Sequence, residues 1–455
     1  MRRSTLTGAA TLAALVLTLT ACAPGGGSAT SSEAGSATAS SAALSTDVAA
    51  AGDITLTVWD QNTDPGINDA QEALNTAFQE KYPNVKIERV SRSFADLKTT
   101  LGLALDAPDA PDVVQANQGY PDMGTFVEAG LLRPIGDYAT LYGWDTAFPA
   151  QQLSLNSFSA DGKTWQGDNL YGVSQTGEVV GVYYNKAKLA ELGITKPVTI
   201  EDFGAALQTA SAAGTLPLEF GNTEKSPGIH LFGIVQAATL GATGVNELVS
   251  GKSGAWTDAG TVEAADLLTQ WTTAGYLPTG SSGISRDAAR DNFAGGGSLF
   301  YVDGTWRLSQ LGEAMGDNVG FLALAPAGST DPVTTGGVGL AWAITGKTTK
   351  TDAAAAYIDF ITNPAAAAVL LENGNLPAVV PADYTPAAGS LESDVISTWN
   401  TVNETNGLVP YLDYATPTFY DTITAAVQEL VAGQYTPQQF ADTLQADAAK
   451  FAESR

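Results

Sequence analysis

The chain has one cysteine, one histidine and three methionines among 455 residues. With Cys22 alone near the N-terminus, no disulfide can form within the chain, and cysteine nucleophiles and Cys-based metal sites are excluded from the body. The single histidine, His230, excludes zinc sites that need two histidines on one helix. The G-x-S-x-G, G-x-G-x-x-G and G-x-x-x-x-G-K-[ST] motifs are also missing. We therefore expect no metal and no cofactor.

Basic residues are few: 21 Lys and Arg stand against 48 Asp and Glu, which gives a formal net charge of −27. Such a surface repels phosphate backbones and anionic headgroups, so we expect neither nucleic-acid binding nor membrane binding through a basic patch. The many carboxylates leave one enzymatic alternative open, a glycoside hydrolase that uses a carboxylate pair.

The N-terminus has the pattern of an export signal. Arg2 and Arg3 precede the apolar stretch 6–19, which is too short to span a membrane stably as a mature helix. The sequence Leu19-Thr20-Ala21-Cys22 resembles the lipobox of bacterial lipoproteins, and this resemblance implies cleavage before Cys22 and acylation of its thiol. We expect a signal peptide over residues 1–21 and an extracytoplasmic protein that lipid on Cys22 anchors to the cell membrane.

Residues 22–52 are nearly all Ala, Gly, Ser and Thr after the cysteine, and they offer little apolar surface to bury. We interpret them as a flexible tether. The part that follows is too long for one hydrophobic core and predicts two domains or lobes.

The body begins with the pattern of a βαβ unit. Residues 54–58 alternate like a half-buried strand, Ala70, Leu74 and Phe78 form a helical stripe, and a second strand starts at Val85. This order predicts a parallel sheet in an α/β fold. Further strands are expected at 111–115, 178–184, 298–302 and 339–345, a hairpin around 161–169, and helices at 125–132, 200–213, 261–274, 351–361, from 364 and from 437.

Six segments, in their order and spacing, resemble the bacterial extracellular solute-binding proteins of family 1, the maltodextrin-binding type that serves ABC importers. They are 56–60 (LTVWD), 111–114 with 126–132, 170–173 with 182–186, 293–308 (FAGGGSLFYVDGTWRL), 336–344 (GGVGLAWAI) and 353–376. The resemblance implies a two-lobed, periplasmic-binding-protein-like fold of type II, a hinged clamshell with a central cleft.

The chain is then expected to cross between lobes near Gln175-Thr176, Ala325-Pro326 and Ile361-Thr362. These crossings give lobe 1 as residues 53–175 plus 327–361, and lobe 2 as residues 176–326 plus 362–455. In open α/β sheets the ends of the strands and the loops after them supply the binding site.

A neutral, hydroxyl-rich ring has apolar faces that an aromatic plane can cover and hydroxyls that carboxylates and amides can bind. Trp306 is the leading candidate, because the family places a stacking aromatic after the corresponding strand. Glu178 matches a position from which maltodextrin-binding members reach the ligand. The other candidates are Asn117 and Gln118 after the third strand, Trp59, Asp60 and Gln61 at the end of the first, and His230, Gly337, Tyr411 and Asp413.

The resemblance implies a binding protein and no catalysis: a monomer that captures a sugar or oligosaccharide and delivers it to ABC permease subunits. The loop after Trp59 lacks the Asp-Lys pair that maltodextrin-binding members use on glucose hydroxyls. Besides the hydrolase, a receptor for a polyol or a glycerol phosphodiester stays open, with Lys225, Arg286 and Arg307 as candidate cations.

Overall fold

The computed structural model describes residues 44–455 and contains two main sheets. The signal peptide, Cys22 and most of the proposed tether lie outside the described residues. The last part of the proposed tether, 44–52, is held against the body, because Val48 is buried and Asn84 donates hydrogen bonds of 2.9 and 2.8 Å to Val48 O and Gly52 O. The folded body therefore starts before Gly52.

The first sheet has the strand order β2-β1-β3-β12-β6. Its first three strands are parallel, as the βαβ pattern predicts, whereas β12 runs antiparallel to both β3 and β6. The strands are β1 (Ile54–Asp60), β2 (Val85–Ser91), β3 (Val113–Ala116), β6 (Val173–Ser174) and β12 (Ala341–Ile344). A small hairpin of β4 (Ser157–Phe158) and β5 (Asn169–Leu170) lies beside it, where the turn signals predict one.

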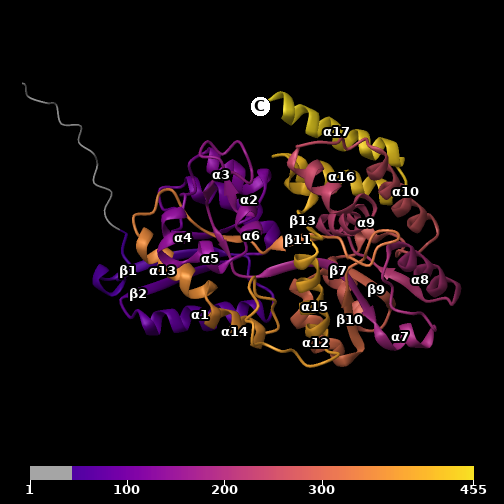
Figure 1. Cartoon of the computed structure of the whole chain (residues 1–455), viewed down its shortest axis with the longest axis horizontal. Helices are drawn as coiled ribbons and strands as arrows, with labels where there is room; N and C mark the ends of the chain where they lie inside the picture. The colour runs from indigo at the N-terminus through magenta and orange to yellow at the C-terminus, as the bar shows by residue number, and fades with distance from the viewer. Residues whose placement is uncertain (1–43) are drawn as a thin grey trace, which may run out of the picture. The chain divides into compact units, whose positions relative to one another are not determined.

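Short helices surround this sheet (Figure 1). They are α1 (Ile67–Lys81), α2 (Phe94–Asp106), α3 (Thr125–Glu128), α4 (Gly136–Tyr142), α5 (Trp144–Ala147), α6 (Ala150–Leu155), α13 (Thr351–Thr362) and α14 (Pro364–Glu372). The side chain of Asn363 accepts a hydrogen bond from Ala366 N and caps α14, the helix expected from residue 364.

The second sheet has the order β13-β11-β7-β9-β8, and β10 extends the β11 side of the long strand β7. Its strands are β7 (Gly177–Asn185), β8 (Leu216–Glu219), β9 (Ser298–Gly304), β10 (Val319–Leu322), β11 (Thr334–Val338) and β13 (Leu408–Val409). All seven residues of β9 are buried, as expected of a strand covered on both faces.

The helices that pack around the second sheet are α7 (Lys186–Glu191), α8 (Ile200–Ala212), α9 (Ser226–Ser250), α10 (Ala259–Thr273), α11 (Arg286–Ala294), α12 (Leu308–Met315), α15 (Leu391–Glu404), α16 (Phe419–Val431) and α17 (Pro437–Glu453). By length and composition α9 could cross a membrane, but 61% of its most apolar window is buried inside the protein. It is a core helix that contacts β9, β11, α10 and α16.

The chain passes between the sheets at three places. The first is Gln175–Thr176, between β6 and β7, where we expected a crossing. The second lies at Gly339–Leu340, because β11 pairs with β7 and not with the first sheet, and the third follows α14, which packs against α1. The backbone bridge between Thr176 and Pro377 brings the first and third passages together. The crossings proposed near Ala325-Pro326 and Ile361-Thr362 differ from this path.

Candidate functional site

Four aromatic rings form a row where strands of the second sheet end. Trp306 follows β9 in the short helix η4 (Thr305–Arg307), and its ring lies 5.2 Å from that of His230 in α9, centroid to centroid. Tyr411 lies 5.7 Å from His230, and Tyr414, in η6 (Leu412–Ala415), lies 5.6 Å from Tyr411. The structure therefore places a row of aromatic rings beside the end of β9, a strand that the sequence predicts.

A glycine lets the indole fold back over the strand that carries it. A Cβ on Gly304 would stand 2.2 Å from the Trp306 ring, so any side chain there would displace the indole. The D-G-T-W sequence thus gives Trp306 both its position after β9 and its orientation.

Two titratable groups of this region, Glu178 and His230, have shifted pKa values. Burial raises the pKa of Glu178, in β7, to about 7, although a 3.0 Å hydrogen bond from Tyr411 OH to its Oε2 and the charge of Arg286 act in the opposite direction. Burial, and then Arg286, lower the pKa of His230 to about 3. His230 is therefore neutral at physiological pH.

Two polar atoms of the row have no hydrogen-bond partner among the described residues. They are Trp306 Nε1 and His230 Nδ1, and both atoms are buried. Buried polar groups are normally paired, so these two unpaired atoms are unusual, and a ligand hydroxyl reaches them only when the lobes open.

The positive charges nearby are already neutralised. The guanidinium of Arg286 lies 5.1 Å from the centroid of the Trp306 ring and forms a two-point ion pair with Asp303. Arg307 Nε donates to the same carboxylate at 3.1 Å. Burial alone raises the pKa of Asp303, but the two arginines outweigh it and hold that pKa well below its usual range. Asp303 therefore stays ionised and pairs with both arginines, and Asp64 at 3.4 Å and Asp287 at 3.2 Å supply Arg307 with further negative charge.

The first lobe faces this row with amides. Asn117 and Gln118 follow β3, as predicted, and Tyr414 OH lies 3.2 Å from Asn117 Oδ1 and 3.0 Å from Gln118 Oε1. A Cβ on Gly119, whose φ is 75°, would stand 2.5 Å from Tyr414, so only glycine fits this approach. The structure therefore brings Asn117 and Gln118 to the second lobe, with the lobes in contact.

The other first-lobe candidates have partners within their own lobe. Both oxygens of the fully buried Asp60 are held by Arg89, at 2.6 and 3.0 Å, and by Ser91 at 2.6 Å. Arg92 covers the ring of Trp59 at 4.5 Å from its centroid, and Gln61 donates its backbone N–H to Gln115. The contact of these three residues with ligand stays a prediction.

Asp413 and Gly337 complete the predicted set. Asp413 is buried in η6, and burial raises its pKa to about 6 against the charge of Lys98. Gly337 pairs with Glu178 across β11 and β7, and a Cβ on it would stand 2.8 Å from Leu155 Cδ1. Gly337 thus lets the two lobes approach closely.

Lys98 is a polar residue of this region that sequence reasoning missed. Its Nζ pairs with Asp122 at 2.6 Å and lies 4.6 Å from the ring centroid of Tyr420, on the other lobe. No local signal marks Lys98, because it is one polar position on the amphipathic helix α2. Among residues 44–455, no three His, Cys, Asp or Glu side chains gather in a way that could hold a metal ion.

Comparisons with known proteins agree with this architecture. The family model for bacterial extracellular solute-binding proteins matches residues 73–397. A multiple sugar-binding protein of Streptococcus mutans is 22% identical over 63% of this chain and 66% of its own length. A probable sugar-binding periplasmic protein of Mesorhizobium japonicum is 32% identical over 21% of each chain. The alignments span less than two thirds of the length of either relative.

Solved structures match over nearly their full length. A chitin oligosaccharide binding protein superposes with a TM-score of 0.75 at 20% identity, over 88% of this chain and 99% of that one. The galacto-N-biose-/lacto-N-biose I-binding protein of the ABC transporter from Bifidobacterium longum, in complex with lacto-N-biose, gives 0.68 at 19% identity, over 89% and 98%. These likenesses confirm the predicted two-lobed α/β fold.

Proposed function

Because the chain belongs to the bacterial extracellular solute-binding proteins, we propose that it captures an uncharged sugar or oligosaccharide between its lobes and delivers it to an ABC importer. The family consists of solute-binding proteins, so this chain is a binding protein and not a hydrolase, as the sequence led us to expect. Its place is outside the cytoplasm.

The sugar assignment depends on polar atoms around Trp306 that have no hydrogen-bond partner within residues 44–455. The indole offers an apolar face, and its Nε1 and the neighbouring His230 Nδ1 have no partner among the described residues. Glu178 lies in the same corner and Asn117 and Gln118 lie opposite Tyr414, so acceptors and donors come from both lobes. Stacking with hydrogen bonds to hydroxyls is the recognition that this set supports.

The neutralised cations argue against the phosphodiester alternative. Arg286 is paired with Asp303, and Arg307 is paired with Asp303, Asp64 and Asp287, so neither offers a free positive charge to an anionic ligand. Lys225, the third candidate, has a backbone φ of 65° at the start of α9, and it is exposed. A sugar or an uncharged polyol suits the site better than a phosphate.

The ligand enters a more open arrangement than the one described, since Tyr414 directly contacts Asn117 and Gln118 here. Hinge bending at the three passages between the sheets supplies that opening. Micromolar affinity, about 8 kcal/mol, is within reach of one stacking contact and a few hydrogen bonds, and it still permits release to the permease.

Isothermal titration calorimetry of the mature chain against neutral mono- and oligosaccharides, polyols and glycerol phosphodiesters tests the assignment. We expect saturable binding of a neutral sugar, with the affinity lowered in Trp306→Ala. Binding of the phosphodiesters alone would overturn the proposal.

We also propose that lipid on Cys22 anchors the protein and that it works as a monomer. Replacement Cys22→Ser should move the protein from the membrane fraction into the soluble extracytoplasmic fraction, while sugar binding stays unchanged. Membrane retention of this variant would contradict the anchor and leave the sugar assignment intact.

A further inference from the structure

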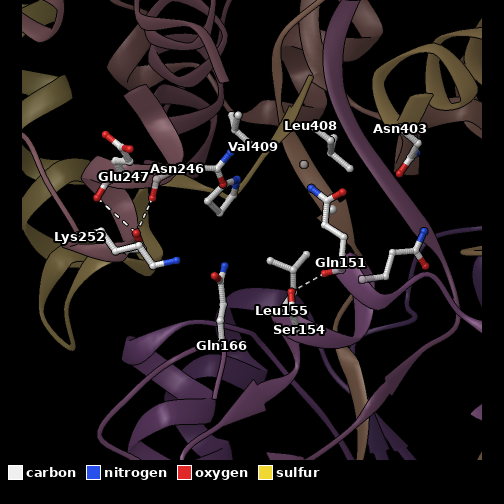
Figure 2. A pocket seen from close by; sticks show the side chains of 15 residues that line it. Gln151, Ser154, Leu155, Gln166, Asn246, Glu247, Lys252, Asn403, Leu408 and Val409 are labelled. Carbon is white, nitrogen blue, oxygen red and sulfur yellow. Dashed lines mark hydrogen bonds between the residues drawn. The ribbon is translucent and has the colours of Figure 1, made fainter. Parts of the chain in front are cut away.

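The two lobes do not meet over a continuous surface. A cavity of about 370 Å³ separates α6 and Gln166 of the first lobe from the end of α9 and β13 of the second. Figure 2 shows Gln166 and Lys252 pointing into this open space from opposite lobes. Because side chains do not pack across this part of the interface, the closeness of the lobes depends on the places where their residues touch directly.

One such place is the last turn of α17. Figure 1 shows this helix running along the second lobe toward the first. The ring of Phe451 lies 4.9 Å from that of Tyr120, centroid to centroid, and the two rings meet edge to face with their planes 63° apart. Tyr120 begins the short helix η2 (Tyr120–Gly124) of the first lobe. The last turn of α17 therefore reaches from one lobe to the other.

A cation joins the two rings. The guanidinium carbon of Arg455, just beyond the end of α17, lies 4.8 Å from the ring centroid of Tyr120 and 4.8 Å from that of Phe451. Attraction between a guanidinium and aromatic faces adds to the edge-to-face contact of the rings. Two side chains of the second lobe and one of the first thus form a single cluster.

Upstream of this cluster, α17 is fixed to the second lobe. Its Phe440 packs edge to face on Phe232 of α9, with 4.7 Å between ring centroids. The carboxylate of Asp447 accepts hydrogen bonds from three threonines at or before the start of α16, which are Thr416, Thr418 and Thr422. Movement of the second lobe therefore carries Phe451 and Arg455 with it.

Tyr120 is fixed equally well in the first lobe. Its ring packs on Phe158 and Trp165, and its hydroxyl accepts a 3.1 Å hydrogen bond from Trp165 N. Tyr120 is only 5% exposed while Phe451 and Arg455 cover it. None of the three passages between the sheets lies in η2 or α17, so side chains alone join these two segments. Separation of the lobes here must break the cluster and expose aromatic surface to water.

We propose that the last turn of α17 is a clasp, in which Phe451 and Arg455 grip Tyr120 and hold the lobes together in the protein without ligand. A ligand enters and leaves the space between the lobes only when they part, so the clasp slows both steps without touching the ligand. The effect on exchange rests on the proposed function, whereas the clasp itself does not depend on any ligand.

Distances between spin labels on the two lobes test the clasp with no ligand present. In the mature chain carrying Cys22→Ser, the substitutions Thr99→Cys on α2 and Gln208→Cys on α8 provide one exposed labelling site on each lobe. No other cysteine remains in the chain. Double electron–electron resonance then gives the populations of short and long distances, which correspond to closed and open forms.

Phe451→Ala removes the ring that meets Tyr120 and one of the two rings that hold Arg455. The ratio of open to closed forms should rise about tenfold, equivalent to about 1.4 kcal/mol. Arg455→Gln keeps Phe451 on Tyr120 and removes only the cation, so the ratio should rise about threefold. Lys450→Ala is the matched control, because Lys450 is exposed in the same turn of the helix, and it should leave the distances unchanged.

The variants act at the surface, since Phe451 is only partly buried and Arg455 is exposed, so melting temperatures should stay close to that of the wild type. The proposal is overturned if Phe451→Ala leaves the distances as they are in the wild type. It is also overturned if Lys450→Ala opens the protein as much as Phe451→Ala does. Either result would stand whether or not the protein binds a sugar, because no ligand enters the measurement.

Discussion

Tyr411 OH donates a 3.0 Å hydrogen bond to Glu178 Oε2, and this bond joins η6 to β7 beside Trp306 and His230. The phenol partly offsets the cost of burying the carboxylate, yet burial prevails and the pKa of Glu178 stays at about 7 against an ordinary 4.5. The charge of this corner of the site therefore changes near neutral pH.

The first prediction concerns stability and pH. A raised pKa means that the folded protein binds a proton more tightly than the unfolded chain, so this stabilisation is full below pH 4.5 and is lost as pH rises through 7. Glu178→Gln cannot ionise and should escape that loss. Relative to the wild type, its free energy of unfolding should rise by about 3 kcal/mol between pH 4.5 and pH 8.

Urea unfolding at a series of pH values measures this difference. Asp413→Asn is the matched control, because burial raises the pKa of Asp413 only to about 6. The gain in unfolding free energy of this variant over the wild type should therefore be complete at a lower pH. Parallel pH profiles for Glu178→Gln and the wild type would contradict the prediction.

The second prediction concerns the indole. Trp306→Ala should weaken binding of the sugar at least tenfold, about 1.4 kcal/mol, without unfolding the protein, since the ring is only partly buried. Trp306→Phe keeps the stacking face and removes the unpaired Nε1, so its affinity for the sugar should lie between those of the wild type and Trp306→Ala.

Calorimetry on the wild type, Trp306→Ala and Trp306→Phe measures the loss of ligand contact. Their melting temperatures show whether either variant has lost the fold instead. An unchanged dissociation constant in Trp306→Ala would remove the indole from the site. Equal losses in both variants would show that the ring nitrogen, and not the stacking face, carries the contact.

Several parts of this arrangement could be read from the sequence because their signals are local. The N-cap of Asn363, the capping box of Thr436 with Gln439, and the strand that ends in D-G-T-W all depend on residues within a few positions of one another. The D-G-T-W pattern also predicted that Trp306 follows the end of a strand.

Other parts depend on contacts between distant segments. The strand β11 reads as T-T-G-G-V, and nothing within it tells whether it pairs with β3 or with β7, so its lobe was assigned incorrectly. The helix α9 escaped prediction because glycines and apolar residues on all sides hide its period. The sequence offers Arg286 as a possible anion ligand, and only the fold shows that it is already paired with Asp303.

The third prediction concerns lobe contact. Tyr414→Phe removes a hydroxyl that bonds to Asn117 and Gln118 of the other lobe, while the ring still packs on Gly119 and Trp165. The contact between lobes should weaken by about 1 kcal/mol, so the ligand-free protein should shift toward open forms. Small-angle scattering should record a larger radius of gyration for this variant without ligand.

Tyr411→Phe is the control, since its hydroxyl bonds within the second lobe and should leave the lobe spacing unchanged. Identical scattering from wild type and Tyr414→Phe would show that this hydroxyl does not hold the lobes together.

The fourth prediction concerns the buried ion pair. Asp303 is 1% exposed and accepts hydrogen bonds from Arg286, Arg307 and Tyr301. Asp303→Asn leaves two guanidinium groups without their buried counter-charge, and breaking a buried pair in this way costs about 3–5 kcal/mol. The pair between the partly buried Arg290 and the exposed Asp291, by contrast, should contribute under about 1 kcal/mol, so Asp291→Asn is the matched control.

The same substitution also tests why the site is assigned to uncharged ligands. With Asp303 neutralised, Arg286 beside Trp306 carries a free positive charge, so Asp303→Asn should bind a sugar phosphate that the wild type rejects, provided the variant remains folded at low temperature. Calorimetry with the neutral sugar and its phosphate ester checks this exchange of preference. If Asp303→Asn still excludes the phosphate while folded, the selection against anions arises from shape and not from the paired arginines.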